Sequence, residues 1–222
     1  MVMTERNAAM TKQISREFSS DIAFTNTVKA LQEKTGSRRG YARMEERGGW
    51  KTAVTPDLAA FLAERDSLYL ATANAEGQPY IQHRGGPKGF LKVIDEKTLG
   101  IADYAGNKQY ISQGNLQEND KAYIFLMDYP NRRRIKVWGR ARMETADTKT
   151  GADLLAKLTD DGYQATPERA LIFEVEAWDV NCPQHITPRY TEEDIGHATA
   201  AMRARIAELE AENAALREKA EA

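Results

Sequence analysis

Between Ser67 and Val180 the sequence repeats one pattern, in which short segments of alternating apolar and polar residues are separated by turns. A period of two residues predicts β-strands with one buried face. The segments with this pattern are 67–74, 79–83, 89–94, 98–104, 122–127, 133–143 and 170–180. Since they do not follow a strict strand, helix, strand alternation, we expect an antiparallel β-barrel, closed or split, and not a parallel sheet.

Turn residues indicate which of these strands are neighbours. The glycine-containing stretch 75–78 separates the first two segments, and 95–97 separates the next two, so we expect two consecutive antiparallel hairpins. Pro130 and Asn131 form a further turn before the segment 133–143.

Helices are predicted beside the strands. Thr55, Pro56 and Asp57 combine a capping hydroxyl, a proline suited to the first helical turn and an acid favoured by the helix dipole. We expect this helix to bury Leu58, Phe61 and Leu62. Further helices are expected over 21–34, where Ile22, Phe24, Val28 and Leu31 recur and Gly36 follows, within 106–119 and near 148–158.

The last thirty residues predict a long helix. Thr191 and the acids after it resemble a capping box, and apolar residues then recur every seven positions at Ile195, Met202, Leu209 and Leu216. Four residues after each of these come Thr199, Ile206, Asn213 and Ala220. A lone Asn among such positions favours an in-register, two-stranded coiled coil, and therefore a homodimer. The alternative is a solvated helix that folds back on its own domain.

Composition excludes several classes of protein. The net charge of -2 and the pI near 6.0 argue against a general nucleic-acid-binding protein. The only cysteine, Cys182, allows no intramolecular disulfide and no thiolate zinc site. We find no signal-peptide core or membrane-spanning run, so we expect a cytoplasmic protein without a membrane or metal partner.

The stretch 131–143 carries six cationic side chains. In a strand, Arg132, Arg134, Lys136 and Trp138 would share one face, and Ile135 and Val137 would lie on the other. Only two or three cations could then reach one ligand group, which is enough for one phosphate. The alternative is that they are solvated charges on an edge strand.

Two glycine-containing loops offer further contacts. Arg84 lies beside Gly85 and Gly86, which leave the backbone open to a ligand, although they could also be only a bend between strands. Gly106, Asn107 and Lys108 are expected to open a helix whose free N–H groups bind phosphate, although Asn107 could be only an N-cap. Together these features predict a site for one mononucleotide phosphate.

The order of hairpin, glycine-rich strand, "LGIADYAGNKQYISQGNLQEND" and basic strand resembles the FMN-binding split barrel of the pyridoxamine 5'-phosphate oxidase family, over 55–180. The resemblance implies a mainly β fold with flanking helices (α+β), preceded by a helical extension over 1–54. It is followed over 181–222 by a loop and a C-terminal helix resembling a coiled coil.

The family also implies FMN as the cofactor and specific contacts to it. By position, Arg84 or Lys92 and the pair Asn107 and Lys108 resemble the residues that hold the FMN phosphate. Arg134 resembles the residue at the flavin ring edge, and Trp178 and Gln184 lie where the family places residues near the flavin.

The C-terminal part departs from the family pattern. The segment "EAWDVNCPQHITPRY" has no equivalent of the Arg-Leu-His-type signature of true oxidases, so the chain more closely resembles the family's flavin-nucleotide-binding relatives. For Cys182 and His185 we expect a buried structural cysteine and a hydrogen-bonded histidine, not a catalytic pair.

The leading hypothesis is a dimeric FMN-dependent oxidoreductase that acts on an unidentified small-molecule substrate or electron donor, with no catalytic residue assigned. One alternative is a non-catalytic flavin carrier or redox sensor. Another is a nucleic-acid-binding protein that uses the arginine-rich strand.

Overall fold

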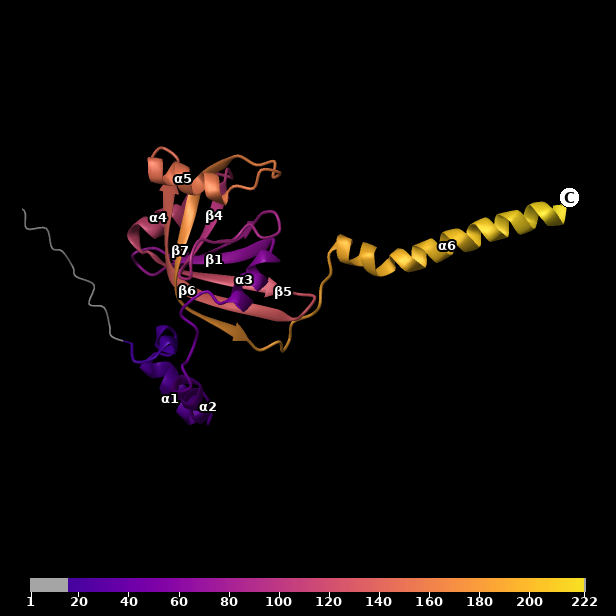
Figure 1. Ribbon diagram of the computed structural model, residues 1–222. Helices are drawn as coiled ribbons and strands as arrows, with labels where there is room; N and C mark the ends of the chain where they lie inside the picture. Colours follow the sequence, from indigo (N-terminus) through magenta and orange to yellow (C-terminus); the bar gives the residue numbers. More distant parts are fainter. Residues whose placement is uncertain (1–15, 222) are drawn as a thin grey trace, which may run out of the picture. The chain divides into compact units, whose positions relative to one another are not determined.

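The computed structural model describes residues 16–221, in which seven antiparallel strands form one sheet (Figure 1). Their order across the sheet is β2-β1-β5-β6-β7-β4-β3. The strands are β1 (Ser67–Ala73), β2 (Pro79–Gly85), β3 (Lys92–Val93), β4 (Thr98–Tyr104), β5 (Lys121–Asp128), β6 (Arg133–Thr145) and β7 (Pro167–Asn181). The predicted antiparallel arrangement is confirmed.

Helices precede, interrupt and follow the strands. They are a 3₁₀ turn (Ser19–Ile22), α1 (Asn26–Lys34), α2 (Arg38–Glu46), α3 (Pro56–Ala63), α4 (Ile111–Glu118), α5 (Lys149–Leu158) and α6 (Glu192–Glu221). The chain divides into two compact units, of which the first contains 16–126 and 135–180 and the second contains 127–134 and 181–221.

One continuous hydrophobic core fills the interior that the curved sheet encloses. It contains the inward-facing residues of five strands together with α3, as expected for a sheet that curves around its own interior. Alternation produces this core, because β1 and β5 bury every second residue. The predicted α+β split-barrel fold is therefore confirmed.

Helix α3 begins as predicted. The Thr55 side chain accepts a hydrogen bond from the backbone N–H of Leu58 (3.3 Å), and Pro56 occupies the first turn. The expected apolar stripe of Leu58, Phe61 and Leu62 is buried.

Strand β4 is buried on both faces. Its inner residues Leu99 and Ile101 belong to the main core, whereas Ala102 packs in a second cluster with Leu155 and Leu158 of α5. Helix α5 thus covers one face of β4 and β7, the strands whose residues Asp103 and Arg169 reach the candidate site.

Aromatic rings beside the N-terminal helices pack against strand β6. Trp50 stacks on Trp138 of β6 with ring centroids 4.5 Å apart, and Phe24 contacts Trp50 edge-on at 5.0 Å. The helix predicted over 21–34 is wrong at its start, because α1 begins at Asn26 behind the cap Thr25. Leu31, expected on the buried stripe, is 56% exposed.

Two further local predictions need correction. The second hairpin is confirmed, but β3 contributes only Lys92 and Val93 to it. The short helix does not open at Gly106, because α4 begins at Ile111 and its N-cap residue is Tyr110 in the left-handed conformation (φ 55°). Asn107 is therefore not the N-cap.

The long C-terminal helix α6 is confirmed, with the predicted capping box at its start. Thr191 Oγ1 accepts a hydrogen bond from the N–H of Asp194 (3.1 Å), and the Asp194 carboxylate accepts one from the N–H of Thr191 (2.9 Å). No described residue of α6 is buried. Among residues 16–221, every helix is too short or too polar to cross a lipid bilayer.

Candidate functional site

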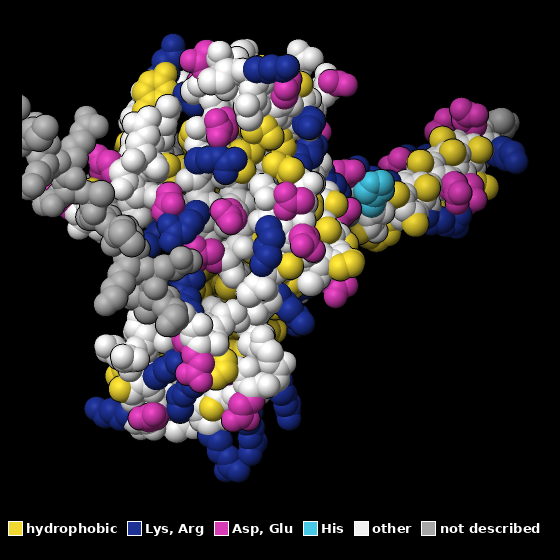
Figure 2. Space-filling model, turned by 60° about the vertical axis from the view of Figure 1, so that its left-hand side comes forward, with side chains coloured by type: hydrophobic (Ala, Val, Ile, Leu, Met, Phe, Trp, Pro, Cys, Tyr) yellow, Lys and Arg dark blue, Asp and Glu magenta, His cyan; other side chains and the backbone are white. Residues whose placement is uncertain are grey.

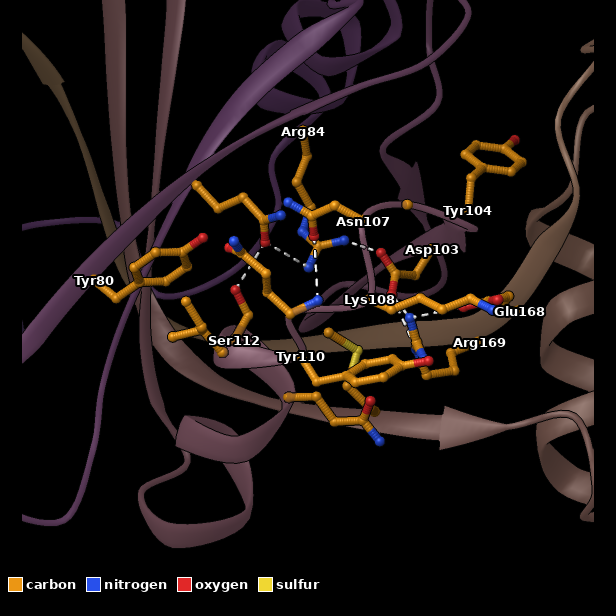
Figure 3. Close-up of a pocket in the computed structure, with 16 residues that line it drawn as sticks. Tyr80, Arg84, Asp103, Tyr104, Asn107, Lys108, Tyr110, Ser112, Glu168 and Arg169 are labelled. Atoms are coloured by element: carbon orange, nitrogen blue, oxygen red, sulfur yellow. Dashed lines mark hydrogen bonds and ion pairs between the residues drawn. The ribbon is translucent and has the colours of Figure 1, made fainter.

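A pocket of about 260 Å³ opens in the first unit where β2, β4, α4 and the beginning of β7 meet (Figure 3). Sixteen described residues line it, including the whole loop from Gly106 to Tyr110 that leads into α4. Most of them are polar or charged, so the pocket is suited to a polar ligand with an anionic group.

Strand β2 lines the pocket with alternate residues. Tyr80, Gln82 and Arg84 are all half-buried, whereas the residues between them are exposed, because successive side chains of a strand point to opposite faces. The Gln82 side-chain carbonyl accepts hydrogen bonds from Ser112 of α4 (2.9 Å) and from Arg84 (3.2 Å). These bonds fix the guanidinium of Arg84 relative to α4.

Two arginines share one carboxylate in the pocket. Arg84 of β2 forms an ion pair with Asp103 Oδ1, and Arg169 of β7 donates from Nε to Asp103 Oδ2 at 3.0 Å (Figure 3). Asp103 and Arg169 are directly opposite in the β4–β7 pairing, so the sheet register brings them together. We call Arg84, Asp103 and Arg169 the arginine–aspartate cluster.

This cluster is largely buried, and Arg169 also forms an ion pair with Glu168 (3.1 Å). Only 14% of each arginine side chain and 7% of the Asp103 side chain are exposed. Burial, and then the neighbouring charge of Arg169, lower the pKa of the Arg84 guanidinium to about 10, so Arg84 is charged at neutral pH. Arg84 Nε is buried and has no hydrogen-bond partner within the described residues.

The loop beside the cluster has an unusual backbone. Lys108 (φ 58°) and Tyr110 (φ 55°) are both in the left-handed region, which non-glycine residues seldom occupy outside functional sites. The guanidinium of Arg169 lies 5.2 Å from the centre of the Tyr110 ring, a cation–π distance. Asn107 Oδ1 accepts a hydrogen bond from the N–H of Gln109 (3.2 Å), which stabilises the turn.

The structure brings three of the predicted cofactor-binding residues together, since Arg84, Asn107 and Lys108 all line the pocket. Arg84 is fixed by the cluster, whereas Asn107 and Lys108 are exposed at the rim. Lys108 reaches the pocket from the loop and not from the helix terminus, because α4 begins three residues later.

Four other predicted residues of the first unit do not line this pocket. Gly85 ends β2, and a Cβ atom on Gly86 would lie 2.7 Å from Cβ of Phe90, so the absence of a side chain there permits packing. Lys92 forms an ion pair with Asp160. Trp178 is buried and donates from Nε1 to the carbonyl of Ala53 (2.7 Å).

The remaining predicted residues belong to the second unit. Arg134, at the start of β6, and Gln184, in the segment after β7, are not among the residues that line the pocket. The expectation of a buried Cys182 is wrong, because its side chain is exposed. His185 is also exposed and has a positive φ of 62°.

Sequence reasoning missed Arg169 and Asp103. Both lie at strand ends, 66 positions apart, and only the β4–β7 register makes them neighbours. Gln82 and Tyr80 of β2 were missed as well. A signal for them was available, because every second residue of a strand lies on the same face, so Gln82 and Tyr80 share the face of Arg84.

Strand β6 alternates as predicted, with Ile135, Val137, Gly139 and Ala141 buried. Three of its cations, Lys136, Arg140 and Arg142, however, contact carboxylates, whereas Nε of Arg134 is buried without a partner among the described residues. Lys136 pairs with Asp179 (3.2 Å), and Arg140 pairs with Asp120 (2.6 Å) and Glu176 (2.8 Å).

Solved structures of three proteins illustrate the similarity of this chain to others. The Group A Streptococcus protein HupZ is 19% identical, with a TM-score of 0.47 over 61% of this chain and 99% of that one. An FMN-binding protein of Syntrophomonas wolfei is 18% identical, with a TM-score of 0.44 over 68% of this chain and 97% of that one. The heme storage protein HutZ of Vibrio cholerae is 17% identical, with a TM-score of 0.37 over 57% of this chain and 94% of that one.

No curated protein matches the sequence significantly. The family model described as pyridoxamine 5'-phosphate oxidase matches residues 54–182, which include the whole pocket and more than half of the 222 residues. The chain therefore belongs to the pyridoxamine 5'-phosphate oxidase family.

Proposed function

We propose that the protein binds FMN and functions as an FMN-dependent oxidoreductase, with the cofactor phosphate held by the arginine–aspartate cluster. One observation carries the proposal. The two largely buried guanidinium groups of Arg84 and Arg169 both pair with Asp103, and Arg169 also pairs with Glu168, but one donor, Arg84 Nε, has no partner among the described residues. A buried unpaired donor is costly, and an anionic ligand that accepts its hydrogen bond would remove this cost.

The charge of the pocket suits one phosphate monoester. Three cations, Arg84, Lys108 and Arg169, face two carboxylates, Asp103 and Glu168, which leaves one positive charge in excess. Guanidinium groups bind phosphate oxygens through paired, charge-assisted hydrogen bonds, and Lys108 adds a charge at the rim.

The size of the pocket assigns only part of the cofactor to it. A volume of about 260 Å³ is near the lower end for small-ligand sites. We therefore assign the phosphate-bearing end of FMN to this pocket. Tyr104, Tyr110, Ile111 and Met143 also line it and would contact the less polar part of the ligand.

When bound, FMN supplies hydride or electron transfer, and the protein supplies binding and orientation. In this proposal Arg84 and Arg169 hold the phosphate in a fixed position, because the β4–β7 register and Gln82 fix both guanidiniums. The substrate and the electron donor are small molecules that the pocket itself does not identify.

A non-catalytic flavin carrier or redox sensor is the second candidate. The observation that favours it is the composition of the pocket, since none of its sixteen described lining residues is His or Cys. Histidine is the side chain that most often transfers protons in catalysis, so its absence from these residues favours binding over turnover.

The two candidates are separated by measurements on the full-length protein. We expect the freshly purified protein to show a flavin absorption spectrum and to release FMN on denaturation, as identified by mass spectrometry. Reduction of the bound flavin by NADH or NADPH in multiple turnovers would support the oxidoreductase, and binding without turnover would support the carrier. A colourless protein that does not bind added FMN at micromolar concentrations would contradict both.

A further inference from the structure

Helix α6 is long and makes no buried contact of its own. It contains 30 residues, Glu192–Glu221, and none of them is buried (Figure 2). Most of the stability of a protein helix comes from packing one of its faces, and isolated helices are marginal in water. Helix α6 therefore needs a partner surface to be stable.

The large apolar residues of α6 occupy only two positions of a seven-residue repeat. With Ile195 at position d, the d and a positions contain all five large apolar side chains of the helix, which are between 40% and 63% exposed. These residues are Ile195, Met202, Ile206, Leu209 and Leu216. No charged residue occupies an a or d position between 195 and 220, so the apolar seam is narrow and uninterrupted by charge.

We propose that α6 pairs with α6 of a second copy of this chain in a parallel, in-register, two-stranded coiled coil over residues 195–220. A seam of only two positions per heptad fits a two-stranded coiled coil, whereas a helix packed on a globular domain usually has a wider apolar face. The proposal does not depend on the ligand of the pocket.

The charges beside the seam support pairing with an identical helix. In a parallel pair, a residue at position g lies near position e of the next heptad in the partner. Arg205 would then face Glu210 of the second copy, and Glu212 would face Arg217 of the second copy. Both contacts join opposite charges, and the twofold symmetry repeats each of them.

The orientation depends on Asn213. The e and g charges also match in an antiparallel pair, but that arrangement places Asn213 opposite Met202, where its amide has no hydrogen-bond partner. In a parallel pair, Asn213 lies opposite Asn213 of the second copy, and the two amides can bond to each other. Because an unpaired buried amide is costly, the parallel arrangement is favoured.

Cysteine cross-linking of the full-length protein tests this directly. The exposed Cys182 is first replaced by Ser so that it cannot react. Met202→Cys and Leu216→Cys are then introduced separately, with Ala211→Cys as a matched control on the opposite face of the helix. In a parallel pair, equivalent d positions are close enough for a disulfide, which needs Cα atoms about 4.4–6.8 Å apart.

We expect Met202→Cys and Leu216→Cys each to form a covalent dimer on mild oxidation, on the order of tenfold faster than Ala211→Cys, because pairing raises the local thiol concentration. Equal rates for all three variants would overturn the proposal. Cross-linking of Thr199→Cys with Leu216→Cys in a mixture, without self-linking of either, would show an antiparallel pair and would also overturn it.

Adding Leu209→Asp or Ala211→Asp to the Leu216→Cys protein gives a second test, since both positions are exposed and neither belongs to the barrel core. We expect only Leu209→Asp to abolish rapid cross-linking at residue 216. Unchanged cross-linking in Leu209→Asp would contradict a seam through this position.

Discussion

Strand β6 has more cationic side chains than the pocket, yet the pocket is the anion site that we propose. In the first unit, Lys136, Arg140 and Arg142 of β6 all contact carboxylates, and these pairs are partly exposed. In the pocket, Arg84 and Arg169 share Asp103 and are nearly buried. Lys136, Arg140 and Arg142 are therefore paired at the surface, while the cluster keeps one buried donor, Arg84 Nε, without a partner among the described residues.

The difference shows that an anion site depends on the charge that remains after internal pairing and on how well water is excluded. A solvated ion pair contributes about 0–1 kcal/mol and offers little to a ligand. A buried cation without a full partner favours an anion more strongly, because the effective dielectric is lower. Substitutions in the cluster should consequently weaken FMN binding, whereas substitutions in the β6 ion pairs should affect only the stability of the fold.

The largest expected effect comes from the cluster. Arg84→Ala should weaken FMN binding about 100-fold, since it removes charge-assisted hydrogen bonds worth roughly 1.5–3 kcal/mol. Binding is measured by flavin fluorescence quenching. Arg84→Lys keeps a charge beside Asp103 and is expected to lose only about tenfold, which separates loss of the ligand contact from loss of the fold.

Lys136→Ala is the matched control in β6, because Lys136 also pairs with a carboxylate but does not line the pocket. Its FMN affinity should stay within about twofold of the wild type. If Lys136→Ala weakened binding as much as Arg84→Ala, the distinction between the two regions would be wrong.

A smaller effect is expected at the rim. Lys108 is exposed, so its charge is partly screened, and Lys108→Glu should weaken FMN binding about tenfold. Lys121→Glu changes an equally exposed lysine outside the pocket and should have no effect. Unchanged FMN content of purified Lys108→Glu would remove Lys108 from the proposed site.

Glu176 should affect stability and not binding. Burial opposes its ionisation, but hydrogen bonds and ion pairs with Arg16 and Arg140 lower the net pKa of Glu176. A lowered pKa stabilises the fold above the unfolded-state value of about 4.5, and this contribution is lost as the pH falls through the folded-state pKa.

Glu176→Gln should accordingly reduce the free energy of unfolding by about 0.5–1 kcal/mol at pH 7. Urea unfolding curves of the variant and the wild type should converge as the pH falls below the lowered folded-state pKa of Glu176. A difference that does not shrink with falling pH would point to lost packing instead of lost charge.

The smallest effect is expected for Arg142, whose contact with Glu144 is exposed (58% and 27% of the side chains). Arg142→Ala should change the free energy of unfolding by less than about 0.5 kcal/mol and leave FMN binding unchanged. A larger loss in urea unfolding would mean that the β6 pairs are more than solvated surface contacts.

Local patterns were sufficient to predict much of the fold. Alternation placed β1, β5 and β6, and the residues around Thr55 predicted the start of α3, because these signals involve neighbours in the chain. The start of α4 was mispredicted since Tyr110 adopts a left-handed backbone that no local residue preference indicates.

The site was less predictable, for a physical reason. Arg84 and Lys108 could be selected from their glycine-containing loops, but Arg169 becomes a neighbour of Asp103 only through strand register. The carboxylates that pair with Arg140 of β6 are likewise remote in the sequence, with Asp120 20 positions and Glu176 36 positions away. Charge pairing is non-local, and a cluster of arginines in the sequence therefore overstates the local positive charge.

The most direct test of the central claim compares FMN with riboflavin, which differs only in lacking the phosphate. If the arginine–aspartate cluster binds that group, the apoprotein should bind FMN about 100-fold or more tightly than riboflavin in calorimetric titrations, and Arg84→Ala should remove most of this preference. Equal affinity for the two flavins in the wild-type protein would contradict the account.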